Sequence, residues 1–185
     1  MANTMYLGKH IFTVLSRAEA NEFAKQTHDQ RISAICIYET WNSDPDVPYE
    51  SNVMNGVKNV LHIHFDDCEA DKENNENVVC ITKEQAKEIV DFFYKVKDDT
   101  DWFVINCYAG MSRSAGCCAA IMRMMYNEDS PVFNNGFFTP NMKVYRMILN
   151  AWLDRIAEDA EKQNTVAWRN ENEEILEGNT NDCDY

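Results

Sequence analysis

Apolar residues along the chain fall into short runs and into longer segments with helical periodicity. The short runs cover residues 32–38, 59–65 and 102–105, and their length is typical of buried strands. A looser alternation over residues 5–15 predicts a further strand at the edge of the sheet.

Helical segments follow most of these runs. Ser16 with Glu19, and Thr82 with Gln85, have the spacing of a capping box, which predicts that a helix begins after each pair. Residues 115–126 are apolar on nearly every side and therefore predict a helix buried within a domain.

The connections are marked by prolines and by polar residues. Residues 41–52 and 68–77 are predicted to be surface loops. Thr139 and Pro140 have the character of a helix cap and of the first helical residue, so the last helix is expected to begin there.

Strands that alternate with helices predict an α/β fold with a mainly parallel central sheet flanked by helices. These elements fill residues 1–155, which we expect to form a single domain. Residues 156–185 form an acidic C-terminal tail that is expected to be helical or disordered.

Charge and cysteine content narrow the class of partner. The net charge of −14 opposes nucleic acid and anionic membranes as partners, and it disfavours very acidic substrates. No apolar stretch has the length of a membrane span, and the start of the chain does not resemble a secretion signal. The seven cysteines follow no disulfide or zinc spacing. We therefore expect reduced thiols in a cytoplasmic protein.

The candidate chemistry lies between the central apolar run and the buried helix. Strand, tight loop and helix N-terminus is a layout that directs backbone N–H groups at an anion. Cys107 at the start of the loop is subject to the same field, which favours the nucleophilic thiolate. Gly110 permits a close backbone approach, and Arg113 can donate two hydrogen bonds to one phosphate. The sequence therefore predicts a phosphate-binding loop with a thiolate at its floor.

This stretch resembles the signature loop of the cysteine-dependent protein tyrosine phosphatases, and in particular their compact dual-specificity group. That pattern is Cys-x-x-Gly-x-x-Arg followed by Ser or Thr. The matching positions are Cys107, Gly110, Arg113 and Ser114. The family normally has a histidine before the cysteine, whereas this chain has Asn106.

The resemblance implies a tyrosine or dual-specificity phosphoprotein phosphatase that works through a cysteinyl-phosphate intermediate, without cofactor or metal. Cys107 would be the nucleophile, Arg113 would bind the phosphate, and Ser114 would hydrogen-bond the sulfur as phosphate leaves it. The residues expected to surround the phosphate are Tyr108, Ala109, Gly110, Met111, Ser112 and Arg113.

The resemblance implies a general acid just after a strand, and we expect it at the end of the predicted strand over residues 59–65. Phe65-Asp66-Asp67 resembles the triplet of the regenerating-liver subgroup, in which the second aspartate is the acid. We therefore prefer Asp67 to Asp66, although both carboxylates could simply end the strand.

The loop also bears on the substrate. Tyr108, Ala109 and Met111 bring no charge, whereas phosphoinositide phosphatases that resemble this family typically carry lysines there. A phosphorylated protein is therefore the expected substrate.

Three other interpretations compete with an active phosphatase. Asn106 in place of histidine is compatible with a catalytically weak or inactive phosphate-recognition module. A rhodanese-like sulfurtransferase also uses a loop cysteine, but Gly110 and Arg113 favour the phosphatase. His62-x-His64-x-Asp66 resembles the opening of the metallo-β-lactamase motif, yet no histidine follows the aspartate, so no metal site is expected.

Overall fold

The computed structural model describes residues 3–40, 54, 57–69 and 78–178, with side chains as far as residue 166. The predicted loop over residues 41–52 lies outside this part, as does most of the loop over residues 68–77. The strands are β1 (Asn3–Leu7), β2 (His10–Ser16), β3 (Ile32–Tyr38), β4 (Asn59–His64) and β5 (Trp102–Cys107). The helices are α1 (Arg17–Phe23), α2 (Lys83–Val96), α3 (Arg113–Tyr126), α4 (Ser130–Phe133) and α5 (Met142–Gly178).

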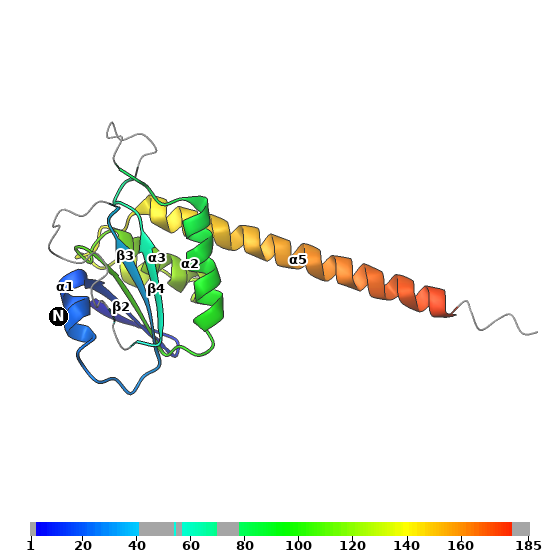
Figure 1. The fold of residues 1–185 in the computed structure, drawn as a ribbon, viewed down its shortest axis with the longest axis horizontal. Helices are drawn as coiled ribbons and strands as arrows, with labels where there is room; N and C mark the ends of the chain where they lie inside the picture. The colour runs from blue at the N-terminus through cyan, green and yellow to red at the C-terminus, as the bar shows by residue number, and fades with distance from the viewer. Residues whose placement is uncertain (1–2, 41–53, 55–56, 70–77, 179–185) are drawn as a thin grey trace, which may run out of the picture. The chain divides into compact units, whose positions relative to one another are not determined.

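The described strands form a five-stranded sheet in the order β1-β2-β5-β3-β4. Only the β1–β2 pair is antiparallel; β2, β5, β3 and β4 run parallel to one another (Figure 1). The predicted α/β fold with a mainly parallel sheet is therefore confirmed, and β5 occupies its centre.

The single edge strand predicted over residues 5–15 is wrong. Leu7 and His10 are register partners across a two-residue turn, so the segment is a hairpin of β1 and β2. Gly8 has a φ of +56°, a backbone conformation that suits such a turn. The apolar alternation continues through the turn, so the sequence pattern does not reveal the turn. Because β1 forms the edge of the sheet, β2 lies inside it.

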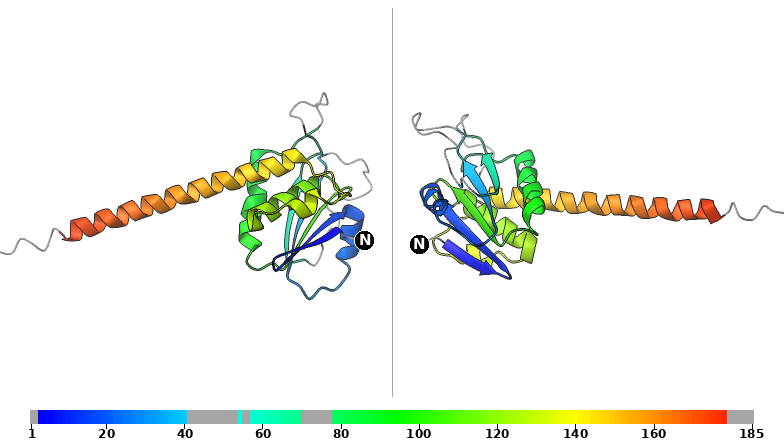
Figure 2. Two further views of the ribbon diagram at one scale, coloured as in Figure 1. Left: turned by 180° about the vertical axis from the view of Figure 1, so that it is seen from behind. Right: turned by 60° about the horizontal axis from the view of Figure 1, so that its bottom comes forward.

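Helices cover both faces of the sheet. Figure 2 shows α1 on one side, with α2 and α3 on the other. Both predicted capping boxes are present, at Ser16 with Glu19 and at Thr82 with Gln85. The core under α1 consists of buried residues from the helix, the sheet and one further segment: Leu15, Ala20, Phe23, Ala34, Cys36, Tyr38, Met54 and Val104.

The α3 helix lies very close to the segment that precedes α5. A Cβ atom added at Gly116 would lie 2.5 Å from the backbone oxygen of Asn141. This glycine therefore allows α3 to approach the backbone at Asn141.

The chain divides into two compact units, Met1–Ala151 and Trp152–Tyr185. The first contains the sheet, α1 to α4 and the first residues of α5, and the second contains the rest of α5. No helix in the described part is both long and apolar enough to span a membrane.

We predict that Gly116→Ala lowers the free energy of unfolding by about 1–3 kcal/mol, the usual cost of overpacking a core. The reason is that the new methyl group would meet a backbone oxygen that cannot rotate away. Urea denaturation measures the change. Gly136→Ala is the matched control, because its Cβ would meet no atom within 4 Å. Equal stability of the two variants would contradict the close approach.

Candidate active site

The predicted phosphate-binding loop connects the central strand to the buried helix. The β5 strand ends at Cys107 and α3 begins at Arg113, so residues 108–112 form the loop between them. Gly110 has a φ of +70°, and a Cβ atom there would lie 2.4 Å from the backbone nitrogen of Ser16. The loop therefore packs against the end of β2 at a distance that only glycine permits.

The backbone of this loop has three of its five carbonyl groups engaged, whereas most of its N–H groups are unpaired among the described residues. The carbonyl oxygens of Tyr108, Met111 and Ser112 accept hydrogen bonds from N–H groups elsewhere in the chain. Within the described residues, the N–H groups of residues 109–112 donate to no other group. Successive unpaired N–H groups are the backbone feature that an anion-binding nest requires.

The thiol of Cys107 lies beneath the loop. The residue is 1% exposed, and its Sγ atom lies 3.1 Å from the Oγ atom of Ser114. Ser114 is fully buried in the first turn of α3. The structure therefore brings the predicted cysteine and serine into hydrogen-bonding contact.

Arg113 is held by two hydrogen bonds while part of its guanidinium group is unpaired. Its Nη1 donates to the carbonyl oxygen of Phe65 at 2.9 Å, and its Nη2 donates to Oε1 of Glu39 at 2.7 Å. Its Nε has no partner although the atom is buried. A guanidinium group fixed in this way retains a donor for a phosphate oxygen.

Glu39 is a site residue that the sequence did not indicate. It follows β3, and its second carboxylate oxygen accepts from Nη2 of Arg17 at 2.5 Å. Burial alone raises the pKa of Glu39, but the hydrogen bonds from Arg113 and Arg17 outweigh it and hold the pKa below its usual range. One ionised carboxylate is therefore shared between two arginines.

The two candidate acids occupy different environments, and Asp66 serves the fold. It is 6% exposed, and its carboxylate accepts from the backbone N–H and hydroxyl of Thr40 and from the N–H of Val79. Burial raises its pKa, whereas these hydrogen bonds lower it by more, so the net shift is downward. A buried carboxylate that is held ionised is a poor proton donor.

Asp67 is exposed and its carboxylate lies against the predicted phosphate-binding loop. Its Oδ1 atom accepts from the Oγ–H of Ser112 at 2.7 Å and from Nδ2 of Asn141 at 2.7 Å. Asp67 is therefore the aspartate whose side chain reaches the loop.

Asn141 is a second residue that the sequence did not indicate. Besides Asp67, its Nδ2 contacts the carbonyl oxygen of Cys68, and its Oδ1 accepts from the N–H of Val144. Asn141 thus caps α5 as well as orienting Asp67, and the predicted cap at Thr139 is wrong. An Asx residue just before a helix was the available signal.

The expectation of reduced thiols is wrong for one pair of cysteines. Cys68 and Cys80 form a disulfide, with their Cα atoms 5.6 Å apart. The neighbouring residues Asp66 and Val79 hydrogen-bond each other in both directions, which brings the two segments together. The segment beside Asp67 is therefore tethered to the residues that lead into α2.

Asn106 precedes Cys107, at the position where the phosphatase family that this loop resembles has histidine. It is fully buried, and neither Oδ1 nor Nδ2 has a hydrogen-bond partner among the residues that the structure describes. Its register partners Leu15 and Cys36 belong to the apolar core under α1. Its side chain therefore makes no hydrogen bond to the loop, and an unpaired buried amide is energetically costly.

The two histidines of the rival metal motif both contact Tyr38. His62 accepts or donates a hydrogen bond with the hydroxyl of Tyr38 through Nδ1, and His64 stacks on the same ring. Among the residues that the structure describes, no group of three His, Cys, Asp or Glu side chains is arranged to hold a metal ion.

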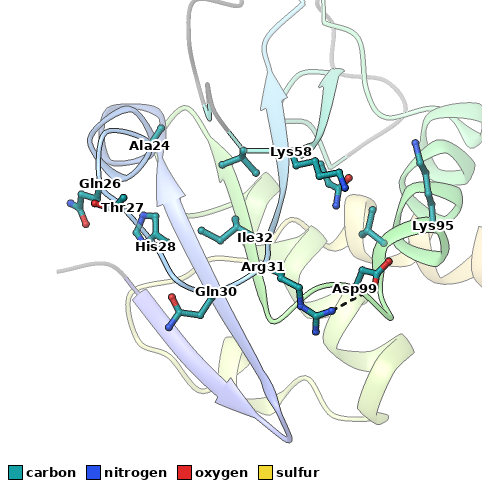
Figure 3. A pocket seen from close by; sticks show the side chains of 13 residues that line it. Ala24, Gln26, Thr27, His28, Gln30, Arg31, Ile32, Lys58, Lys95 and Asp99 are labelled. Atoms are coloured by element: carbon teal, nitrogen blue, oxygen red, sulfur yellow. Dashed lines mark hydrogen bonds and ion pairs between the residues drawn. The ribbon is translucent and has the colours of Figure 1, made fainter.

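A separate hollow of about 820 Å³ lies away from these residues (Figure 3). It is lined by the end of α1, the first residues of β3 and β4, and the end of α2, including Thr27, Ile32, Lys58 and Lys95. The hollow therefore lies at the amino ends of the parallel strands β3 and β4. By contrast, Glu39 and Asp67 follow the carboxyl ends of β3 and β4, and Cys107 is the last residue of β5. The predicted site residues thus lie at the edge of the sheet where α/β proteins usually bind ligands.

The fold can be compared with solved structures, although no protein-family model and no curated protein matches the chain. Tk-PTP in its active form matches with a TM-score of 0.51 and 17% identity, over 80% of this chain and 94% of Tk-PTP. PTPMT1 in complex with PI(5)P gives a TM-score of 0.54 and 12% identity, over 84% of this chain and 98% of PTPMT1. Human DUSP28 gives a TM-score of 0.50 and 14% identity, over 80% of this chain and 94% of DUSP28. The chain therefore has the fold of the dual-specificity and tyrosine phosphatases.

Proposed function

We propose that the chain is a phosphoprotein phosphatase, of tyrosine or dual specificity, that hydrolyses phosphate monoesters through a cysteinyl-phosphate intermediate. One observation carries this proposal. The Cys107 thiol lies under a loop of unpaired N–H groups, and the Asp67 carboxylate is hydrogen-bonded to Ser112 of that same loop. Nucleophile, anion site and proton donor are therefore within reach of one phosphate group.

In the first step, the phosphate would be bound by the loop N–H groups and by Arg113. Cys107 reacts as the thiolate: its Sγ atom bonds to phosphorus while the bond from phosphorus to the ester oxygen breaks. Asp67 in its acid form gives its proton to that oxygen, so the product leaves as a neutral hydroxyl. Arg113 and the N–H groups stabilise the charge on the phosphoryl oxygens during the transfer.

In the second step, a water molecule takes the place of the departed product. Its oxygen bonds to phosphorus, the bond from phosphorus to sulfur breaks, and the Asp67 carboxylate accepts a proton from the water. Ser114, 3.1 Å from Sγ, donates a hydrogen bond to the departing thiolate. Inorganic phosphate is released, and Asp67 and Cys107 return to their starting forms.

The loop interior supports a phosphoprotein as the substrate. Tyr108, Ala109 and Met111 offer no positive charge to additional phosphates of a polyphosphorylated headgroup. Tyr108 is 65% exposed beside the thiol, so an apolar and aromatic surface is presented next to the phosphate site. This surface is compatible with the ring or methylene groups of a phosphorylated side chain.

A second candidate function rests on Asn106. The family histidine helps to order the backbone around the cysteine, whereas the buried amide of Asn106 has no hydrogen-bond partner. Without that support the loop would bind phosphorylated partners and cleave them slowly. The alternative is therefore a phosphate-recognition module with little turnover.

Replacing the nucleophile should abolish the reaction. Cys107→Ser is expected to lower turnover of 4-nitrophenyl phosphate by roughly 10⁴-fold or more, because an unactivated hydroxyl replaces the thiolate. The control is Cys36→Ala, which removes a thiol whose pKa is raised to about 12 by burial. Steady-state kinetics of both variants test the assignment, and undiminished turnover in Cys107→Ser would disprove it.

Asp67→Asn is expected to lower kcat by about 10²- to 10⁴-fold, since the amide cannot protonate the leaving oxygen. The loss should shrink as the leaving group becomes more acidic. Asp66→Asn is the matched neighbour and should instead lower the free energy of unfolding, because it weakens three hydrogen bonds. Kinetics over a series of aryl phosphates, together with urea denaturation, separate the two. A leaving-group dependence seen only for Asp66→Asn would reverse the assignment.

Asn106→His is expected to raise turnover of 4-nitrophenyl phosphate about tenfold, because an imidazole can hydrogen-bond the loop and carry positive charge. Asn106→Leu is the control, since it also removes the unpaired amide. It should increase the free energy of unfolding by about 1–3 kcal/mol without raising kcat. If wild type binds phosphate without turnover and Asn106→His gains it, the recognition module is the correct function. Equal kcat in all three proteins would show that position 106 does not limit the rate.

A further inference from the structure

Arg17 lies beside the phosphate-binding loop, yet the proposed mechanism does not use it. Its backbone N–H donates to the carbonyl oxygen of Tyr108 at 3.2 Å. Its guanidinium carbon lies 5.3 Å from the ring centre of Tyr38 and 5.6 Å from that of Tyr108. Both distances are within the range of cation–π contacts, so the two rings fix the position of the charge.

Part of this guanidinium group is available to a ligand. Nη2 of Arg17 donates to Glu39, and Nε is buried without a partner. Nη1 makes no hydrogen bond in the described part of the chain and is not among the buried unpaired atoms. The side chain as a whole is 26% exposed. Arg17 therefore presents the N–H groups of Nη1 to a ligand beside the loop.

The local charge around Arg17 differs from the average charge of the chain. Arg17 and Arg113 together carry two positive charges against the single negative charge of Glu39, which leaves one positive charge in this cluster. The chain as a whole carries −14. Screening at physiological ionic strength acts over about 8 Å, so the distant acidic residues that dominate the net charge act only weakly on a group that contacts Arg17.

We propose that Arg17 and Tyr108 form a subsite for an anionic side chain next to the phosphorylated residue of the substrate, either a carboxylate or a second phosphate. This inference rests on the proposed phosphatase function and narrows its substrate class. Arg17 supplies the charge, and the exposed Tyr108 ring fixes its guanidinium group beside the phosphate-binding loop. Acidic flanking residues are thereby favoured, against the expectation from net charge alone.

Three phosphotyrosine peptides of one length test this proposal. One has alanine on both sides of the phosphotyrosine, one has glutamate, and one has phosphoserine. The readout is the ratio of kcat/KM for each acidic peptide to that for the alanine peptide. An effect of Arg17 on Arg113 through Glu39 is common to all three peptides and cancels in this ratio. Wild type should give a ratio of about five at low ionic strength, the size expected of one partly exposed ion pair, and less at high salt.

Arg17→Met should bring the ratio close to one, mainly through KM, and Arg17→Lys should retain part of it. Lys25→Met is the matched control because it removes the same charge from an exposed side chain that pairs with Glu22. It should leave the ratio as in wild type. The glutamate and phosphoserine arms identify which anion the subsite prefers.

A ratio of one in wild type, or an unchanged ratio in Arg17→Met, would overturn the subsite. Absence of Cys107-dependent turnover on every substrate would instead contradict the proposed function. In that case the same ratios are measured as affinities, by fluorescence anisotropy of labelled peptides with the Cys107→Ser protein. The subsite is then supported or rejected without reference to catalysis.

Discussion

The arrangement of the site depends on one ion-pair network, in which the Glu39 carboxylate is shared by Arg113 and Arg17. A guanidinium group that is only 4% exposed cannot be buried without a partner, because desolvation of an unpaired charge costs several kcal/mol. Glu39 supplies this partner from the end of β3, and the carbonyl oxygen of Phe65 supplies a second acceptor from the end of β4. Two neighbouring parallel strands thus set the direction of Arg113 before any phosphate is bound. Glu39 alone would neutralise the positive charge of Arg113. Because Arg17 also contacts Glu39, the three side chains together keep one positive charge.

The adjacent aspartates Asp66 and Asp67 make different contacts in the same region. Asp66 points inward and ties the end of β4 to Thr40 and Val79, while Asp67 points to the loop. Successive residues of an extended chain face opposite sides, so fixing the first aspartate determines where the second is directed. Asn141, which caps α5, then restricts the Asp67 carboxylate from a third direction. The position of the proposed acid is therefore a product of three elements that are remote in sequence.

The parts of this picture that the sequence predicted are those that depend on short-range spacing. The strand–loop–helix layout around Cys107, the two capping boxes and the mainly parallel sheet all follow from local patterns. The sequence preferred Asp67 by resemblance, and the structure directs that carboxylate at Ser112. Glu39 and Asn141 escaped prediction because their partners lie 74 residues away, and an isolated Glu or Asn carries no local signal of such a contact.

Two other differences between the predicted and the observed structure also arise because the sequence carries no local signal of them. The β1–β2 hairpin was missed because a two-residue turn does not interrupt the apolar alternation. The Cys68–Cys80 disulfide was missed because the backbone pairing of Asp66 with Val79 is what makes the two thiols neighbours.

The burial of α3 has a consequence for covalent labelling of this protein. Burial raises the pKa of Cys117 and of Cys118, so both thiols remain protonated and screened from reagents at neutral pH. Burial raises the pKa of the Cys36 thiol as well, and the sulfur of Cys68 is bonded to that of Cys80. Among the described cysteines that remain free, Cys107 is the one that lies beneath the proposed phosphate-binding loop. An electrophile carrying a phosphate-like group would therefore discriminate among the described thiols by their surroundings, so an activity-based probe should label Cys107 without removal of Cys36, Cys117 or Cys118.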